Sequence, residues 1–312
     1  MASPTYTFTG GDTPANYTPT TISEVGSMIG KIAEQVIRVV SAKNPLEVFK
    51  KLPVQNGDTI EQAIVKLASA QAYDSTGAGA LSRKTPALAV MYFNDWTRAK
   101  FETTIDTSLL RKVLTDGKNV SDLSSKVVGV LSESDKYEEF TQLKNLMKWG
   151  RQSADGGTGA VLKNFQTVAY SNGINYQGVL TAIKDAVSGM KFVNTSFNTG
   201  SVNRSTNPED IYILMPYKLK NLIDVEELSG VFNLDKAEMK SRIIEIDTDI
   251  ESKYFYIYIV DKNAILDYTR LYEMADQKNA DGLFWNYFLH TDRMYGISPL
   301  FDAGYIKVGA QS

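Results

Sequence analysis

The sequence predicts an α+β protein, with helices in the first part of the chain and strands in the second. Before residue 190, apolar residues recur every three or four positions in several stretches, as in amphipathic helices. From Asp210 onward, the short apolar runs "IYILMPY", "RIIEI" and "YFYIYIV" are typical of buried strands. Between these segments, the glycine-containing stretches "DSTGAGALSRKTP" and "SADGGTGAVLKN" are expected to be flexible joints.

Composition excludes several classes of active site. The 312 residues include no cysteine and a single histidine, His290, so thiolate metal sites, cysteine nucleophiles and multi-histidine zinc sites are excluded. The net charge of −3 does not indicate a dedicated nucleic-acid binder, although a protein that encloses nucleic acid fits it. The first twenty residues do not resemble a signal peptide, and no apolar window is long enough to span a membrane, so a soluble intracellular protein is expected.

The N-terminal part predicts two helices. The first ends near Pro45, and its apolar stripe packs either on its own core or on a neighbouring subunit. That stripe consists of Ile22, Val25, Ile29, Ile32, Val36 and Val39. The second helix, "DTIEQAIVKLASAQA", is predicted from a capping box formed by Thr59 and Gln62.

Residues 87–105 predict a long two-stranded hairpin with Asn94 and Asp95 in its turn. In its second strand, residues alternate between two faces: Ala99, Phe101, Thr103 and Ile105 on one, and Arg98, Lys100, Glu102 and Thr104 on the other. An isolated hairpin of this kind is only marginally stable in water, so we expect it to lie against another surface.

Further helices are expected after the hairpin. The first is capped by Asp106 and ends at Gly117, and "VSDLSSKVVGVL" continues the helical pattern. The next, "SDKYEEFTQLKNLMKW", places Tyr137, Phe140, Leu143 and Met147 on one face. Residues 175–189 predict another helix, and "LKNLIDV" a short one among the later strands.

Three features of the sequence are candidate sites of chemistry. The glycine clusters lack the lysine and hydroxyl of a phosphate-binding loop and are interpreted as hinges. The segment "DTDIE", with Asp247 and Asp249, resembles the acidic motif of metal-dependent glycosyltransferases, but acidic residues are also common in solvated turns. His290 has Asp292 as a same-face neighbour on a predicted strand, which suggests a general base, although a structural role fits such a histidine better.

The later part of the chain resembles a known family. "IYILMPYKLKNLIDVEELSGVFN" resembles the opening of the central domain in tailed-phage major capsid proteins, and "YIVDKNAILDY" the passage that leads out of it. "NADGLFWNYFLHTDRMYGISPLFDAGYIKV" is similar to the C-terminal strands of capsid proteins from small podophages of Gram-positive bacteria. This resemblance implies the tailed-phage major capsid fold of the Hong Kong ninety-seven type, and no catalytic residue, cofactor or metal.

The resemblance also implies a division of the chain. The N-terminal arm is expected at 1–73, the extended hairpin loop at 74–106, and the axial domain at 173–269. The peripheral domain, with its spine helix, is expected at 107–172 and 270–312. The expected contacts between subunits come from the arm stripe (Ile22, Ile29 and Val36) and from the hairpin (Arg98, Lys100, Phe101 and Glu102).

The implied function is a head shell built from pentamers and hexamers of this chain, assembled in the bacterial cytoplasm and present in the virion. Its implied partners are a portal, a scaffolding protein where one is used, and packaged double-stranded DNA contacted non-specifically, with no membrane. An encapsulin-type compartment shell, a phage tail or collar component, and a metal-dependent glycosyltransferase remain as alternatives.

Overall fold

The computed structural model describes most of the chain after residue 40. The described residues are 41–55, 57–73, 75–76, 83–106, 117–169, 175–221, 242–247, 250–251 and 254–309. The predicted first helix, with Ile22, Ile29 and Val36, lies outside them. The chain forms two compact units: one comprises 1–41, 101–133 and 274–289, and the other comprises 42–100, 134–273 and 290–312.

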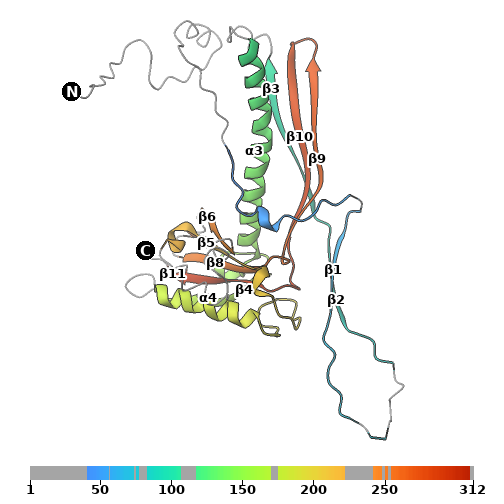
Figure 1. Ribbon diagram of the computed structural model, residues 1–312, viewed down its shortest axis with the longest axis vertical. Helices are drawn as coiled ribbons and strands as arrows, with labels where there is room; N and C mark the ends of the chain where they lie inside the picture. Colours follow the sequence, from blue (N-terminus) through green and yellow to red (C-terminus); the bar gives the residue numbers. More distant parts are fainter. Residues whose placement is uncertain are drawn as a thin grey trace, which may run out of the picture. The chain divides into compact units, whose positions relative to one another are not determined.

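The larger unit contains a mixed sheet with the strand order β4-β11-β8-β5-β6 (Figure 1). These strands are β4 (Lys163–Val168), β5 (Ile211–Pro216), β6 (Ile243–Ile246), β8 (Tyr254–Asp261) and β11 (Ala303–Gly309). The central strand β8 is antiparallel to β11 and β5, while β11–β4 and β5–β6 are parallel pairs. The two-residue strand β7 (Ile250–Glu251) also pairs with β8. The predicted strands in this region are therefore confirmed.

Both faces of this sheet are covered, which explains the continuous apolar runs in its strands. On one face, α4 (Tyr176–Met190) packs its apolar side chains on alternate residues of β5, β8 and β11. On the other, Leu143 and Met147 of α3 (Gly117–Gly150) join Leu46 and Phe49 over the remaining residues of the same strands. As a result, every residue of β5 is buried.

The helix α4 begins and runs as the sequence predicts. Its N-cap is Asn175, whose side-chain oxygen accepts a hydrogen bond from the Gly178 amide at 2.9 Å. The short helix α5 (Tyr217–Lys220) follows β5 directly, so it begins earlier than predicted.

The helix α3 differs from the prediction in two respects. The helix expected between Asp106 and Gly117 falls on residues 107–116, which lie outside the described residues. Gly117 itself is helical, and the two later stretches expected as separate helices form one continuous element. The buried face is also different, because Tyr137 is 64% exposed. The buried residues instead follow one another at four-residue steps: Leu131, Asp135, Glu139, Leu143 and Met147.

A second sheet has the strand order β3-β10-β9. Its strands are β3 (Trp96–Asp106), β9 (Ile265–Asn279) and β10 (Phe284–Ile297), and all three run through both compact units. In the smaller unit, the Asn279 side chain shapes the β9–β10 turn by accepting hydrogen bonds from the amides of Asp281 and Gly282, both at 3.0 Å.

The predicted hairpin is wrong in its pairing. β2 (Leu88–Phe93) pairs antiparallel with β1 (Ile60–Val65), whereas β3 belongs to the sheet with β10 (Figure 1). The stretch predicted as the second helix therefore contains a strand, and Thr59 and Gln62 form no capping box. Its residues alternate between half-buried and exposed positions, a period of two that the capping pattern concealed. Asn94 and Asp95 connect strands of two different sheets.

The second glycine-rich joint is packed rather than hinge-like. A Cβ atom added at Gly157 would lie 2.1 Å from the carbonyl oxygen of Arg151, and one at Gly159 would lie 2.7 Å from the Trp149 ring. Gly157 itself is buried. The close approach of the backbone to these neighbours therefore requires glycine at both positions. Most of the first joint, including Gly77 and Gly79, lies outside the described residues.

Candidate inter-subunit surfaces

The predicted contact face of β3 is exposed. Arg98, Lys100 and Glu102 are exposed while Phe101 is half-buried, which confirms the predicted alternation. Arg98 also has a partner within the chain, because its Nε lies 3.2 Å from Oδ2 of Asp292. The exposed face of β3 is therefore available, but part of its charge is already neutralised.

A polar cluster holds the root of the β1–β2 hairpin, and we refer to Asp58, Trp96, Arg98, Arg270 and Asp292 as the root cluster. Arg270 donates to the carboxylates of both Asp58 and Asp292, the latter at 2.7 Å. Its guanidinium lies 4.6 Å from the centre of the Trp96 ring, and Trp96 Nε1 donates to the Asp58 carbonyl oxygen at 2.5 Å. One arginine thus connects the start of the hairpin with β3, β9 and β10.

We expect Asp58→Ala to loosen the hairpin while leaving the fold intact. The Asp58 side chain is 82% exposed, so its loss costs at most about 1 kcal/mol of unfolding free energy. The measurement is the distance distribution between spin labels on Ala70→Cys and Thr181→Cys, which are unique sites because the chain has no cysteine. The distribution should broaden in Asp58→Ala. Glu61→Ala, which removes an exposed carboxylate from the same hairpin, is the matched control, and equal broadening in both variants would contradict the prediction.

A buried ion cluster joins α3 to β10 and to the segment before β1. Arg293 donates to Asp135 at 2.6 Å and also to Glu139, and these side chains are only 3–6% exposed. Glu139 further accepts hydrogen bonds from Asn44 at 2.7 Å and Lys50 at 3.1 Å. Burial raises the pKa of Asp135, against the opposing effect of Arg293. Local sequence patterns do not predict this cluster, because its only signal along the chain is a pair of acidic residues, Asp135 and Glu139, at a four-residue step.

Asp267, at the start of β9, is a buried acid without hydrogen-bonded side-chain oxygens. It is 0% exposed, and neither carboxylate oxygen has a hydrogen-bond partner. Its backbone carbonyl accepts from the Lys51 amide at 2.8 Å, which attaches the N-terminal segment to β9. Burial raises the pKa of Asp267 to about 6, with Lys50 acting in the opposite direction. This acid is therefore expected to titrate near neutrality.

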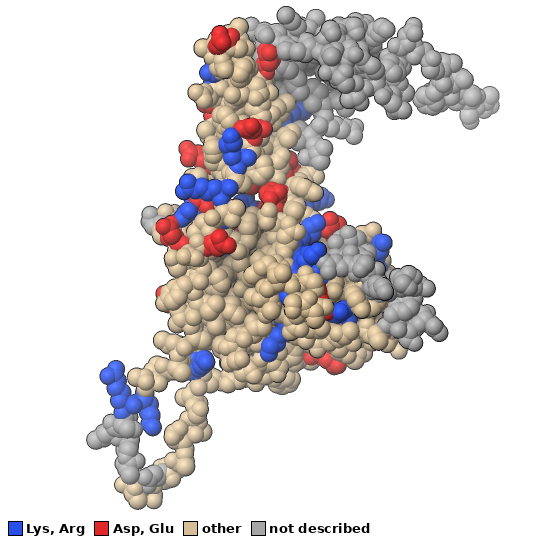
Figure 2. Space-filling model, turned by 180° about the vertical axis from the view of Figure 1, so that it is seen from behind, with Lys and Arg blue, Asp and Glu red and all other residues tan. Residues whose placement is uncertain are grey.

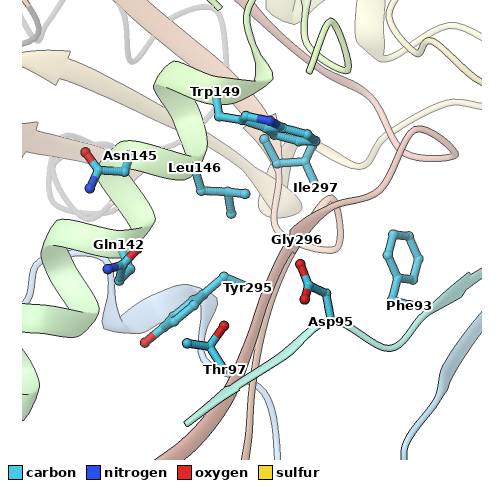
Figure 3. A pocket seen from close by; sticks show the side chains of 10 residues that line it. All are labelled: Phe93, Asp95, Thr97, Gln142, Asn145, Leu146, Trp149, Tyr295, Gly296 and Ile297. Atoms are coloured by element: carbon cyan, nitrogen blue, oxygen red, sulfur yellow. The ribbon is translucent and has the colours of Figure 1, made fainter. Parts of the chain in front are cut away.

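A pocket of about 420 Å³ opens beside the hairpin root (Figure 3). Its apolar part comprises Trp149, Leu146, Ile297 and Phe93. Its polar lining includes Asp95, an exposed carboxylate on the connection between β2 and β3. The lining comes from three distant segments, the β2–β3 connection, α3 and the end of β10, which local sequence patterns could not bring together.

The far end of the β1–β2 hairpin combines exposed apolar and basic side chains. Leu67, Tyr73 and Leu88 are 65%, 94% and 57% exposed. The described residues 66–73, 75–76 and 83–88 contain Lys66, Arg83 and Lys84 and no acidic residue, and Figure 2 shows these basic side chains on the projecting loop. We refer to residues 66–73 and 83–88 as the hairpin tip. Exposed apolar side chains beside charges of one sign are typical of an interaction surface.

Neither of the two candidate enzyme sites is assembled by the described residues. Asp247 forms an ion pair with Lys144 at 2.7 Å, and Asp249 lies outside the described residues. His290 is half-buried in β10, while Asp292 is engaged by Arg270 and Arg98. Among the described residues, no group of three or more acidic or histidine side chains is placed to hold a metal ion. No described helix is long and apolar enough to cross a membrane.

Comparison with known proteins identifies relatives that match most of the chain. A family model described as "Phi29-like phage major capsid protein" matches residues 10–307. The major capsid protein of Bacillus phage GA-1 is 27% identical over 89% of this chain, and that of Streptococcus phage Cp-1 is 21% identical over 87%. This chain spans 59% of the Bacillus phage protein and 79% of the Streptococcus phage protein.

Solved capsid structures share the fold. The capsid structure of Staphylococcus phage Andhra matches with a TM-score of 0.74 and 12% identity, over 90% of this chain and 88% of that one. The capsid structure of cyanophage P-SCSP1u matches with a TM-score of 0.58 and 14% identity, over 90% and 92%. The predicted tailed-phage capsid fold is therefore confirmed.

Proposed function

Because the chain belongs to the Phi29-like phage major capsid protein family, we propose that many copies of it assemble into the icosahedral head shell that encloses the phage double-stranded DNA. The observation that carries this proposal is the projecting β1–β2 hairpin with its exposed apolar tip. A two-stranded hairpin is only marginally stable by itself and gains stability against another surface. A neighbouring copy of the chain supplies such a surface in a shell.

The proposed domain division is the one expected from the sequence, except that the extended loop begins earlier. The extended loop is assigned to the β1–β2 hairpin and its connection, so it begins near Asp58 instead of residue 74. The arm then occupies the residues before it, and the spine helix is α3 within the peripheral domain. The axial domain, expected at 173–269, is built on the sheet centred on β8, to which β4 and β11 also contribute.

Assembly is proposed to rest on many modest contacts. The exposed β3 residues Arg98, Lys100 and Glu102, with Phe101 beside them, contact a neighbouring subunit, and the arm stripe of Ile22, Ile29 and Val36 docks on another. Such contacts are head-to-tail, and they generate closed pentamers and hexamers where the rotation closes. Closure makes the individual contacts act together, so each can be weak.

The remaining partners are proposed from the same role. A portal occupies one vertex, a scaffolding protein guides assembly where one is used, and the completed shell is part of the virion. The chain carries a net charge of −3, which suits a wall that contacts packaged DNA without binding it tightly. Assembly in the host cytoplasm is part of the same proposal, and no catalytic step is assigned to the chain.

Electron microscopy of the purified protein tests this proposal. We expect rings or closed shells from the wild-type chain, expressed alone or with the other head proteins of its phage. Replacing residues 66–87 by a short Gly-Ser turn should abolish shells while changing the melting temperature of the subunit little, because these residues lie beyond the β1–β2 ladder. Shells from the truncated variant, or a wild-type chain that stays monomeric in both settings, would contradict the proposal.

A further inference from the structure

We propose that the segment leading into the β1–β2 hairpin is a latch that protonation of Asp267 holds closed. We refer to this segment, residues 44–54, as the tether. It contains the 3-10 helix η2 (Glu47–Phe49) and lies against the start of β9. While Asp267 is protonated the tether stays on β9, and once Asp267 ionises the tether detaches more often. This inference goes beyond the proposed function and does not depend on it, because the latch lies within one subunit.

The tether is attached to β9 by a short run of backbone hydrogen bonds. The amides of Lys51 and Val54 donate to the carbonyl oxygens of Asp267 and Thr269, at 2.8 and 2.9 Å respectively. The burial of β9 ends where this contact ends, because the strand is mostly buried up to Thr269 and exposed over residues 271–279. The tether therefore covers the part of β9 that contains Asp267, and its detachment admits water there.

In the closed position the Asp267 carboxylate has no direct partner. It is 0% exposed, and neither of its oxygens accepts a hydrogen bond. The two cations of the tether are held elsewhere: Lys50 Nζ lies 3.1 Å from Oε2 of Glu139, and Lys51 Nζ donates to the carbonyl oxygen of Lys262 at 2.9 Å. A buried charge without hydrogen bonds is costly, so ionisation of Asp267 favours the detached position, in which water solvates the carboxylate.

The other titratable groups around Asp267 do not supply the missing compensation. They are Asp135 and Glu139 of α3, and Arg293 and Tyr295 of β10. Arg293 is already bound to both acids of α3, and burial raises the pKa of Tyr295 to about 12, so this phenol stays neutral. Burial also raises the pKa of Asp267 to about 6, and the charge of Asp135 acts in the same direction.

The direction and size of the effect follow from the two positions of the tether. With the tether detached, Asp267 is in water and has the ordinary aspartate pKa of about 4, whereas with the tether closed its pKa is about 6. Because the closed position binds the proton more tightly, rising pH favours detachment. With these two values, the equilibrium constant for opening rises about tenfold between pH 5 and pH 7.5.

The latch acts at the base of the proposed arm. The arm stripe of Ile22, Ile29 and Val36 precedes the tether in the sequence, and β1 follows it. A closed tether fixes the point at which the arm joins the subunit, and a detached tether releases that point.

Amide hydrogen exchange of unassembled subunits tests the latch. The amides of Lys51 and Val54 report detachment of the tether, and the amides of the β8–β11 ladder report global unfolding. After correction for the intrinsic pH dependence of exchange, we expect the open fraction at the two tether amides to rise about tenfold between pH 5 and pH 7.5. The ladder amides should be more strongly protected than the tether amides at each pH. Equal protection of the two sets would overturn the inference, because the tether would then open only by global unfolding.

Variants of two acids on β9 assign the pH dependence to one side chain. Asp267→Asn should remove most of the rise in the open fraction, because the side chain no longer titrates, and Asp267→Ala replaces it where the asparagine variant does not fold. Asp276→Asn, which neutralises an exposed acid on the same strand, is the matched control and should keep the full rise. A rise in Asp267→Asn as large as in the wild type would overturn the inference while leaving the shell function intact.

Discussion

Arg293→Met is expected to lower the free energy of unfolding by about 3–5 kcal/mol, as for other buried ion pairs that lose one partner. Arg293 is 3% exposed and is bonded to both Asp135 and Glu139. Its removal leaves two carboxylates that are 4% and 2% exposed with much less compensation. Urea unfolding of unassembled subunits at neutral pH measures the change.

Two further variants separate the loss of compensation from the loss of packing. Adding Asp135→Asn and Glu139→Gln to Arg293→Met should recover part of the stability, because a neutral cluster no longer contains buried uncompensated charge. Arg98→Met is the exposed control: the Arg98 side chain is 78% exposed, so its loss should cost at most about 1 kcal/mol. A large loss in Arg293→Met without any recovery would assign the effect to packing alone.

The same cluster explains why the buried face of α3 was predicted incorrectly. Acidic residues normally face solvent, so the apolar periodicity predicts a buried face made of Tyr137, Phe140, Leu143 and Met147. In the structure the face continues through Asp135 and Glu139, whose charges are compensated by Arg293 and Lys50. The partner that permits their burial lies more than 150 residues away along the chain, and no local pattern reveals it.

Strands were easier to predict than their pairing. β5 and β8 are covered on both faces, so each is a continuous apolar run that can be recognised locally. The partner of β2 depends on long-range registry, and Asn94-Asp95 resembles a hairpin turn whichever strands it connects. The exposed face of β3 was predicted correctly because the alternation of its residues is a local pattern. The pocket was not predicted, because its lining combines the β2–β3 connection with α3 and β10.

Asp267→Asn is expected to stabilise the subunit at pH 7.5. Above its folded-state pKa of about 6, Asp267 is a charged group that is 0% exposed and has no hydrogen bond to either carboxylate oxygen. The amide of asparagine has a similar shape and carries no charge. A folded-state pKa about two units above the unfolded value corresponds to a destabilisation of up to about 3 kcal/mol.

The pH dependence follows from the same shift. Between pH 4 and 6 the folded state binds the Asp267 proton more tightly than the unfolded state, so the contribution of Asp267 to stability falls as pH rises through this window. Below pH 4 the acid is protonated in both states and the contribution is constant. The difference in unfolding free energy between Asp267→Asn and the wild type should therefore be largest at pH 7.5 and close to its minimum at pH 4. Comparing the two proteins cancels the titration of acids that do not interact with Asp267, such as Asp155, whose pKa is lowered, against the effect of burial, by its hydrogen bonds to Lys307 and Tyr305. A difference that stays constant with pH would mean that Asp267 does not titrate in this window.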